Sequence, residues 1–107
     1  MKRRTVTRRP AAKTDLLEHY VFIGEENLDA ADRFLAEAGA TFEKLAAMPR
    51  MGRRWESEDR RLGAIRVWPM PGWKRLIFYR PGRSGIEIVR VLHAARDITA
   101  IIRDENE

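Results

Sequence analysis

The sequence predicts an α+β domain in which a helical hairpin packs on a small, mostly antiparallel sheet, in the order β-α-α-β-β-β. Three observations carry this prediction: two stretches with helical apolar spacing, a change to strand chemistry after Pro49, and turn-forming clusters between the last three strands. A chain of 107 residues supplies apolar surface for one core. We therefore expect a single domain over residues 1–107.

A short strand and two helices are expected in the first half of the chain. Residues 4–8 alternate charged and β-branched side chains, which is typical of a strand. Pro10 suits the first turn of a helix, because its missing N–H is no loss there, and Gly24 ends that helix. Asn27 or Asp29 can cap a second helix, whose apolar positions keep helical spacing as far as Pro49: Ala31, Phe34, Leu35, Ala38, Phe42, Leu45 and Met48.

The second half is expected to form a three-stranded meander after a polar, Arg-rich connection at residues 50–61. Its strands are expected at residues 64–68, 73–80 and 86–93. Clusters rich in Pro and Gly separate them at residues 69–72 and 81–85, and both have hairpin length. Residues 94–103 add a closing helical turn, with three side chains packing inward: Ile98, Ile101 and Ile102.

One helical hairpin cannot cover both faces of a sheet, so one face is expected to stay partly open. Strict alternation assigns two sets of side chains in the last strand: Val89 and Val91 against Ile88, Arg90 and Leu92. It also places Arg66 and Trp68 on one side of the first meander strand, and Arg75 and Tyr79 on one side of the middle strand. Such a face suits phosphate and base contacts. Alternatively, Trp68 and Tyr79 cover the edge of the core.

Charge is strongly segregated along the chain, whose formal net charge is +5. Residues 1–13 hold six basic and no acidic groups, residues 14–48 hold eight acidic against two basic groups, and residues 49–107 are again basic. This distribution predicts one negative and one positive surface, the latter suited to a polyanion or an acidic protein. With no cysteine and no apolar run of membrane-spanning length, we expect a cytoplasmic protein without disulfides, thiolate metal sites or cofactors.

Five segments in order resemble the ParE/RelE superfamily of toxins from bacterial type II toxin–antitoxin systems, and ParE most closely. They are the start of the second helix (Ala30, Ala31, Phe34), LAAMPRMG at residues 45–52, LGAIR at 62–66, IFYR at 77–80 and IEIVRVLHAARD at 86–97. Each is weak alone, but their order and spacing span nearly the whole chain. The resemblance implies the RelE/ParE-like β-α-α-β-β-β fold.

The resemblance also implies a toxin that a cognate ParD-like antitoxin neutralises by wrapping it, so we expect a hetero-oligomer with that antitoxin. ParE-type toxins are understood to poison DNA gyrase, and this is the target we expect. RelE-type relatives on the same fold instead cut messenger RNA on the ribosome, and fold alone cannot separate the two outcomes. A ribosome-dependent endoribonuclease is therefore the alternative, and a non-toxic homologue is a third.

The scarcity of side chains that could transfer a proton favours the gyrase hypothesis. RNA cleavage needs a base and an acid, and only His93 is an obvious titrating candidate, since residues 94–107 lack Tyr, His and Lys. His19 is expected to be a solvated helix residue. As target-binding residues the signature indicates four: Arg66, Arg90, His93 and Arg96. As antitoxin-binding anchors, three indoles near turns and polar segments are indicated: Trp55, Trp68 and Trp73.

Overall fold

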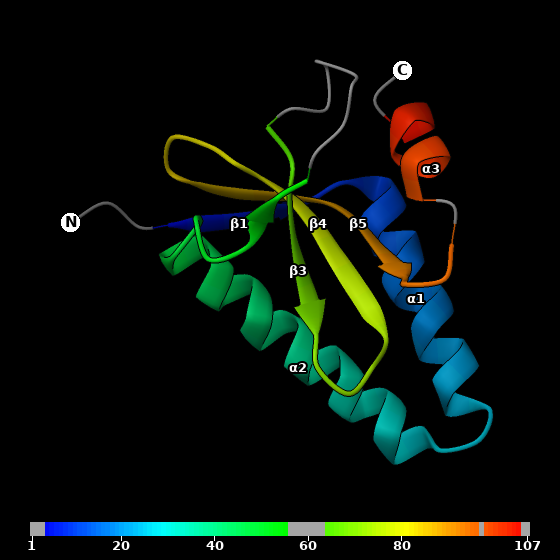
Figure 1. The fold of residues 1–107 in the computed structure, drawn as a ribbon. Helices are drawn as coiled ribbons and strands as arrows, with labels where there is room; N and C mark the ends of the chain where they lie inside the picture. Colours follow the sequence, from blue (N-terminus) through cyan, green and yellow to red (C-terminus); the bar gives the residue numbers. More distant parts are fainter. Residues whose placement is uncertain (1–3, 56–63, 97, 106–107) are drawn as a thin grey trace.

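A computed structural model describes residues 4–55, 64–96 and 98–105 (Figure 1). The elements in chain order are β1 (Thr5–Arg8), α1 (Pro10–Gly24), α2 (Leu28–Ala47), β2 (Arg53–Arg54), β3 (Arg66–Met70), β4 (Arg75–Pro81), β5 (Gly85–His93) and α3 (Ile98–Glu105). The strands form one sheet in the order β1-β5-β4-β3-β2, in which β1 runs parallel to β5 and the other pairs are antiparallel. The predicted α+β class is confirmed.

The helix boundaries follow the local chemistry that predicted them. Pro10 occupies the first turn of α1, after Arg9 in extended conformation. Asn27 caps α2, because its side-chain oxygen accepts a hydrogen bond from the Ala30 N–H at 3.0 Å. Of the two predicted caps, Asn27 is therefore the one used. The predicted strands, β1 included, start and end within two residues of the predicted positions, and β2 was not predicted at all.

Helices α1 and α2 lie on the same face of the sheet, where α2 passes behind β3 and β4 in the view of Figure 1. The main core lies between the helices and this face. It joins Phe34, Phe42 and Leu45 of α2 to Ile77 and Tyr79 of β4, all at most 1% exposed. The amphipathic spacing of α2 therefore buries the stripe that predicted it.

A second, smaller core covers the opposite face of the sheet. Val67, Phe78 and Leu92 pack there with Ile102 of α3, and Trp55, Ile98 and Ile101 cover its rim. The predicted inward packing of the closing helical turn is confirmed. The prediction of an open face bearing Arg and aromatic groups is wrong, because the side that carries Trp68 and Tyr79 faces the helices and Tyr79 is fully buried.

The strict alternation predicted for the last strand is also wrong. Val91 packs with Ile88 in the main core, whereas Val89 packs with Leu92 in the second one. The cause is a register shift at Phe78 and Tyr79: Tyr79 pairs with Ile88, but Phe78 pairs with Arg90. One extra residue in β5 reverses the side on which the following side chains lie.

The connection after α2 contains β2, which pairs with β3 through Arg53 and Arg54. Residues 56–61 of the predicted polar connection lie outside the described residues. Among the residues that the structure describes, no helix is long and apolar enough to cross a membrane.

Candidate functional site

Helix α1 lies beside β5 beyond the end of β1, along the edge of β5 that faces away from β4. β1 pairs with residues 85–88 of β5, and the Arg9 N–H then donates to the Ile88 carbonyl at 3.0 Å. Farther along β5, the Val91 N–H donates to Asp15 Oδ2 at 3.0 Å, and the Val91 carbonyl lies 2.8 Å from His19 Nε2. Asp15 and His19, one helical turn apart, thus satisfy the strand edge with side chains.

Asp15 also binds the Arg90 guanidinium in a two-pronged ion pair. Arg90 Nε and Nη2 each donate to one carboxylate oxygen at 2.7 Å. Asp15 is 4% exposed, so this pair is held in a largely desolvated place and fixes α1 to β5. A carboxylate that already accepts three hydrogen bonds is poorly suited to act as a base.

His19 is fixed through both ring nitrogens. Nε2 donates to the Val91 carbonyl, which leaves Nδ1 to accept from Arg75 Nε at 3.1 Å. Burial is the main cause that lowers the pKa of His19; the adjacent Arg75 lowers it further, while the Val91 carbonyl acts in the opposite direction. The imidazole is therefore held neutral, with its proton on Nε2.

Arg75 is a buried cation with no carboxylate partner among the described residues. Its side chain donates to His19 Nδ1 and, through Nη1, to the Trp73 carbonyl at 2.7 Å. The residue is only 8% exposed, and burial lowers its pKa. An unpaired buried guanidinium favours the approach of an anionic group.

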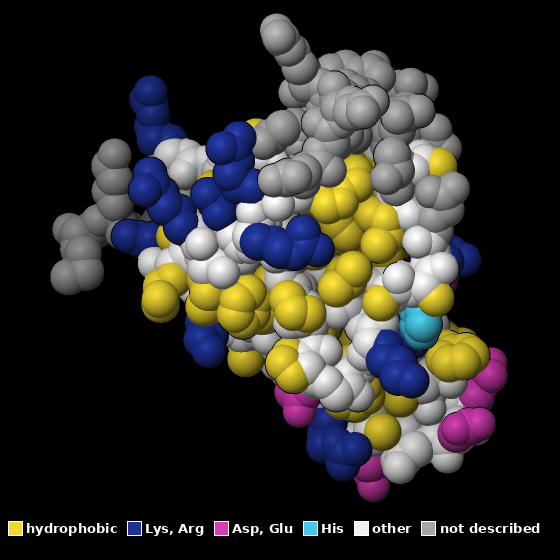
Figure 2. All heavy atoms as spheres, in the orientation of Figure 1, with side chains coloured by type: hydrophobic (Ala, Val, Ile, Leu, Met, Phe, Trp, Pro, Cys, Tyr) yellow, Lys and Arg dark blue, Asp and Glu magenta, His cyan; other side chains and the backbone are white. Residues whose placement is uncertain are grey.

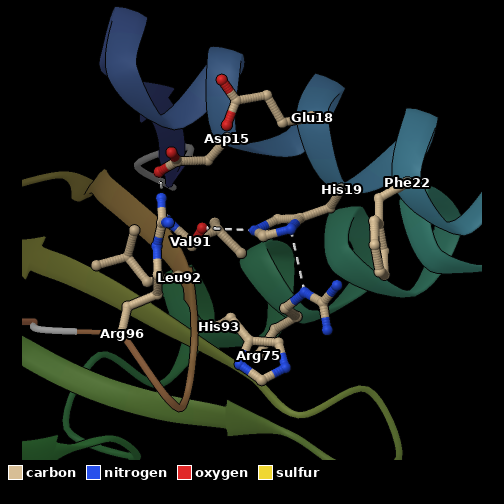
Figure 3. A pocket seen from close by; sticks show the side chains of 9 residues that line it. All are labelled: Asp15, Glu18, His19, Phe22, Arg75, Val91, Leu92, His93 and Arg96. Carbon is tan, nitrogen blue, oxygen red and sulfur yellow. Dashed lines mark hydrogen bonds between the residues drawn. The ribbon is translucent and has the colours of Figure 1, made fainter.

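Arg75 borders a cavity of about 380 Å³, which we call the Arg75 cavity. Figure 3 shows the Arg75 guanidinium close to the rings of both His19 and His93, with Phe22 at its side. Asp15, Glu18 and Arg96 complete the polar lining, and the Asp15 carboxylate is already engaged by Arg90. His93 Nδ1 accepts the Ala95 N–H at 3.1 Å, so Nε2 of that ring remains the nitrogen available to a ligand. The cavity can therefore bind an anionic group through several N–H donors.

The four predicted target-binding residues do not form one surface. His93 and Arg96 share the Arg75 cavity, whereas Arg90 is engaged by Asp15. Arg66 lies in β3 at another cavity, where its Nη1 donates to the Gly52 carbonyl at 2.7 Å. Roles for these residues in target binding stay predictions.

The three predicted antitoxin-binding tryptophans are divided between the two faces of the sheet. Trp55 packs on the second core, where its ring meets Phe78 edge to face at 5.7 Å between centroids. Trp68 and Trp73 pack against the main core, and Trp73 meets Phe34 edge to face at 5.3 Å. Trp73 Nε1 also donates to Glu37. All three are partly buried, and their role stays a prediction.

Asp15, His19 and Arg75 were not predicted as site residues, and the prediction that His19 is solvated is wrong. The available signal was the four-residue spacing of Asp15 and His19, next to the buried Leu16 rather than opposite it. Nothing in the sequence pattern indicated that Arg75, one residue among many arginines, would meet His19. No group of three or more His, Cys, Asp or Glu in the described ranges is placed to hold a metal ion.

Acidification is expected to destabilise the fold through His19. Its pKa is below 6.5 in the folded chain and near 6.5 when unfolded, so below that pH the unfolded state binds more protons. The free energy of unfolding should therefore be fully retained above that pH and fall as the pH is lowered from about 7 to about 5. Urea unfolding at several pH values measures this. His19→Gln should flatten the slope and His93→Gln should not; equal slopes in all three proteins would contradict the assignment.

Comparisons with known proteins identify a family and a similar solved structure. The model of the family described as "ParE toxin of type II toxin-antitoxin system, parDE" matches residues 6–98. No curated protein matches the chain in sequence. Among solved structures, the chain is similar to one from the chromosomal ParDE toxin–antitoxin system of P. aeruginosa, with a TM-score of 0.68 and 17% identity over 84% of this chain and 95% of that one. At that identity the likeness concerns the fold.

Proposed function

The chain belongs to the ParE toxin family of type II toxin–antitoxin systems, and on that premise we propose that it inhibits DNA gyrase and is neutralised by a cognate ParD-like antitoxin. A gyrase poison needs a surface that binds the gyrase–DNA assembly, because the covalent break in DNA is made by the topoisomerase. It needs no acid and base of its own, and this requirement separates the proposal from ribonuclease chemistry.

The observation that carries the proposal is the state of the groups around the Arg75 cavity. His19 is held neutral with both nitrogens in hydrogen bonds, and Asp15 accepts three hydrogen bonds. Neither is available to exchange a proton with RNA. His93 remains, but one group cannot supply both the base for a 2′-OH and the acid for the leaving oxygen.

The same cavity suits contact with an acidic part of a protein target. Arg75, His93 and Arg96 present N–H donors from β4, the end of β5 and the segment after it. Guanidinium groups bind carboxylates in a planar, two-pronged manner. We assign the contact with gyrase to this cavity, which keeps His93 and Arg96 from the sequence prediction and adds Arg75.

Purified protein is expected to inhibit DNA supercoiling by gyrase, and its expression without antitoxin should induce DNA-damage signalling. An Arg96→Gln variant should inhibit about tenfold less, the usual effect of losing one charged contact at a binding site. Arg33→Gln, which changes an exposed arginine of α2, is the matched control. Codon-positioned cleavage of messenger RNA in a translation extract, with gyrase unaffected, would overturn the proposal in favour of the ribonuclease. If neither pathway responds, the chain is a non-toxic homologue.

The antitoxin is assigned to the outer side of the helical hairpin. Leu17 and Val21 of α1 and Leu28 at the start of α2 are 52–62% exposed. Leu17 and Val21 are four residues apart and so share one side of α1. Exposed apolar side chains on one side of a helix suit an amphipathic helix of a partner. Such a segment can supplement contacts at Trp68 and Trp73, whose rings are partly buried at the main core.

A Val21→Glu variant is expected to escape neutralisation while it stays toxic. Burying a carboxylate in an apolar contact should cost about 2 kcal/mol or more, roughly thirtyfold in affinity. Co-expression with the ParD-like protein of the neighbouring reading frame, scored by growth and by co-purification, measures this. Met48→Glu introduces the same charge at an exposed apolar residue just after α2 and should be neutralised normally. Equal neutralisation of both variants would contradict the assignment.

A further inference from the structure

Six arginines gather at the end of the sheet where β1, β2 and the β4–β5 turn meet the C-terminal end of α2. We call them the arginine end: Arg4, Arg50, Arg53, Arg54, Arg66 and Arg83. Arg4, Arg50 and Arg66 line a cavity of about 770 Å³, and Arg4 and Arg83 line a neighbouring one of about 520 Å³. Arg54 stands opposite Arg66 in the β2–β3 register. Figure 2 shows many of the Lys and Arg side chains gathered over this end.

Two of these arginines are held in place by backbone carbonyls. Arg4 Nη1 donates to the carbonyls of Ala46 and Ala47, at 3.2 and 2.7 Å, in the last turn of α2. Arg66 Nη1 donates to the Gly52 carbonyl in the segment that follows. The carbonyl end of a helix favours a cation such as Arg4. Both guanidinium groups are held by backbone carbonyls rather than by a carboxylate. Arg66 Nη1 also lies 3.5 Å from the Arg50 carbonyl. A guanidinium has five N–H donors, and no described residue accepts from Nε or Nη2 of either arginine.

The other four arginines have exposed side chains that form no ion pair with the described residues. The contrast with Arg9 and Arg80 is direct, because Glu87 lies 3.1 and 3.7 Å from them. No Asp or Glu belongs to the lining of the two cavities as the structure describes it. Like charges brought together without counter-charges repel each other, and an incoming anion removes that cost.

We propose that the arginine end binds the phosphate backbone of duplex DNA. A row of fixed and free guanidinium groups matches a polymer that carries regularly spaced phosphates. A single strand would need aromatic stacking surfaces, and the cavity linings hold none: besides arginine they consist of Ala, Met, Pro, Gly and Ser. Many Asp and Glu side chains in Figure 2 lie over the helical hairpin, away from the arginine end. Their negative charge repels a polyanion and so directs it to the arginine end.

The choice of DNA over RNA rests on the proposed function, since gyrase holds duplex DNA. The arginine end would then contact the DNA segment beside the enzyme, while the Arg75 cavity contacts protein. Phosphate contacts carry no sequence information, so binding at the arginine end is expected to be independent of DNA sequence and strongly dependent on salt.

Fluorescence anisotropy with a labelled DNA duplex of two helical turns, over a range of salt concentrations, tests the proposal. Arg50→Gln/Arg83→Gln should weaken binding by about tenfold or more at low salt and reduce the slope of log K against log salt by about 2, because each phosphate contact contributes about 0.9. Both side chains are exposed and form no hydrogen bond or ion pair with the described residues, so the variant should unfold like the wild type. Lys13→Gln/Arg33→Gln removes the same charge from exposed positions on α1 and α2 and should bind nearly as the wild type does.

Absence of binding by the wild type, or equal weakening in the two double variants, would overturn the proposal. Tighter binding of an RNA duplex of the same sequence would overturn the assignment to DNA. Gyrase inhibition is scored separately in the same proteins. If the wild-type protein binds DNA but leaves gyrase active, the proposed gyrase function is refuted and DNA binding by the arginine end stands. If it inhibits gyrase without binding DNA, the proposal for the arginine end is refuted and the gyrase function stands.

Discussion

An Asp15→Ala variant is expected to lose about 3–5 kcal/mol of unfolding free energy, the usual cost of removing one partner of a buried ion pair. The carboxylate is almost fully buried and accepts from Arg90 Nε, Arg90 Nη2 and the Val91 N–H. Its loss removes these three hydrogen bonds from Arg90 and from the Val91 N–H, and frees α1 from the edge of β5. Urea unfolding followed by circular dichroism measures the effect.

The control is Glu18→Ala, on the same helix but exposed, which should change the free energy of unfolding by less than about 0.5 kcal/mol. Asp15→Ala/Arg90→Met removes the guanidinium of the ion pair as well, so it should be more stable than the sum of the two single variants indicates. Strict additivity, or a loss under about 1 kcal/mol for Asp15→Ala, would show that the ion pair does not hold α1 to the sheet.

A Gly52→Ala variant is expected to lose about 3 kcal/mol through overpacking and a disrupted hydrogen bond. A Cβ at this position would lie 2.5 Å from Tyr79 Oη and 2.9 Å from the Val67 carbonyl. Tyr79 cannot retreat, because it is fully buried and its hydroxyl donates to the Pro49 carbonyl at 2.7 Å while accepting the Gly52 N–H at 2.9 Å. This network fixes the segment after α2 to the sheet.

Gly39→Ala provides the matched control, since an added Cβ meets nothing within 4 Å in the interior of α2. It should gain about 0.5–1 kcal/mol, because alanine has fewer unfolded conformations and a higher helix propensity. Thermal unfolding of both variants gives the comparison. If Gly52→Ala is as stable as the wild type, the segment from Pro49 to Gly52 is not held by Tyr79.

Much of the architecture follows from local sequence. The spacing of Phe34, Ala38, Phe42 and Leu45 predicts α2 and also the residues that become its buried side. Asn27 and Pro10 mark helix starts because each acts on the backbone within a few residues of itself. The Pro- and Gly-rich clusters predict the meander for the same reason. The segregation of charge also predicts that an acidic and a basic region lie apart, as Figure 2 shows.

Only part of the candidate site could be predicted from the sequence. His93 and Arg96 were predicted from a local signature, and they do line the Arg75 cavity. Arg75 and Asp15 were missed, because their partners are distant in the chain: Arg75 meets His19 across 56 positions, and Asp15 meets Arg90 across 75. Composition cannot select those arginines from the 21 Lys and Arg residues of the chain.

The sequence by itself determined the α+β class, the order of the elements apart from β2, and the toxin family. Periodicity, caps and turns act between near neighbours, and the signature is read along the chain. Tertiary structure decided which face of the sheet the helices cover, where β5 bulges and how β5 is completed after β1 ends. Each depends on groups that only folding brings together. The edge of β5 shows why: the hydrogen-bonding groups of Val91 need partners, and the nearest are Asp15 and His19 of α1.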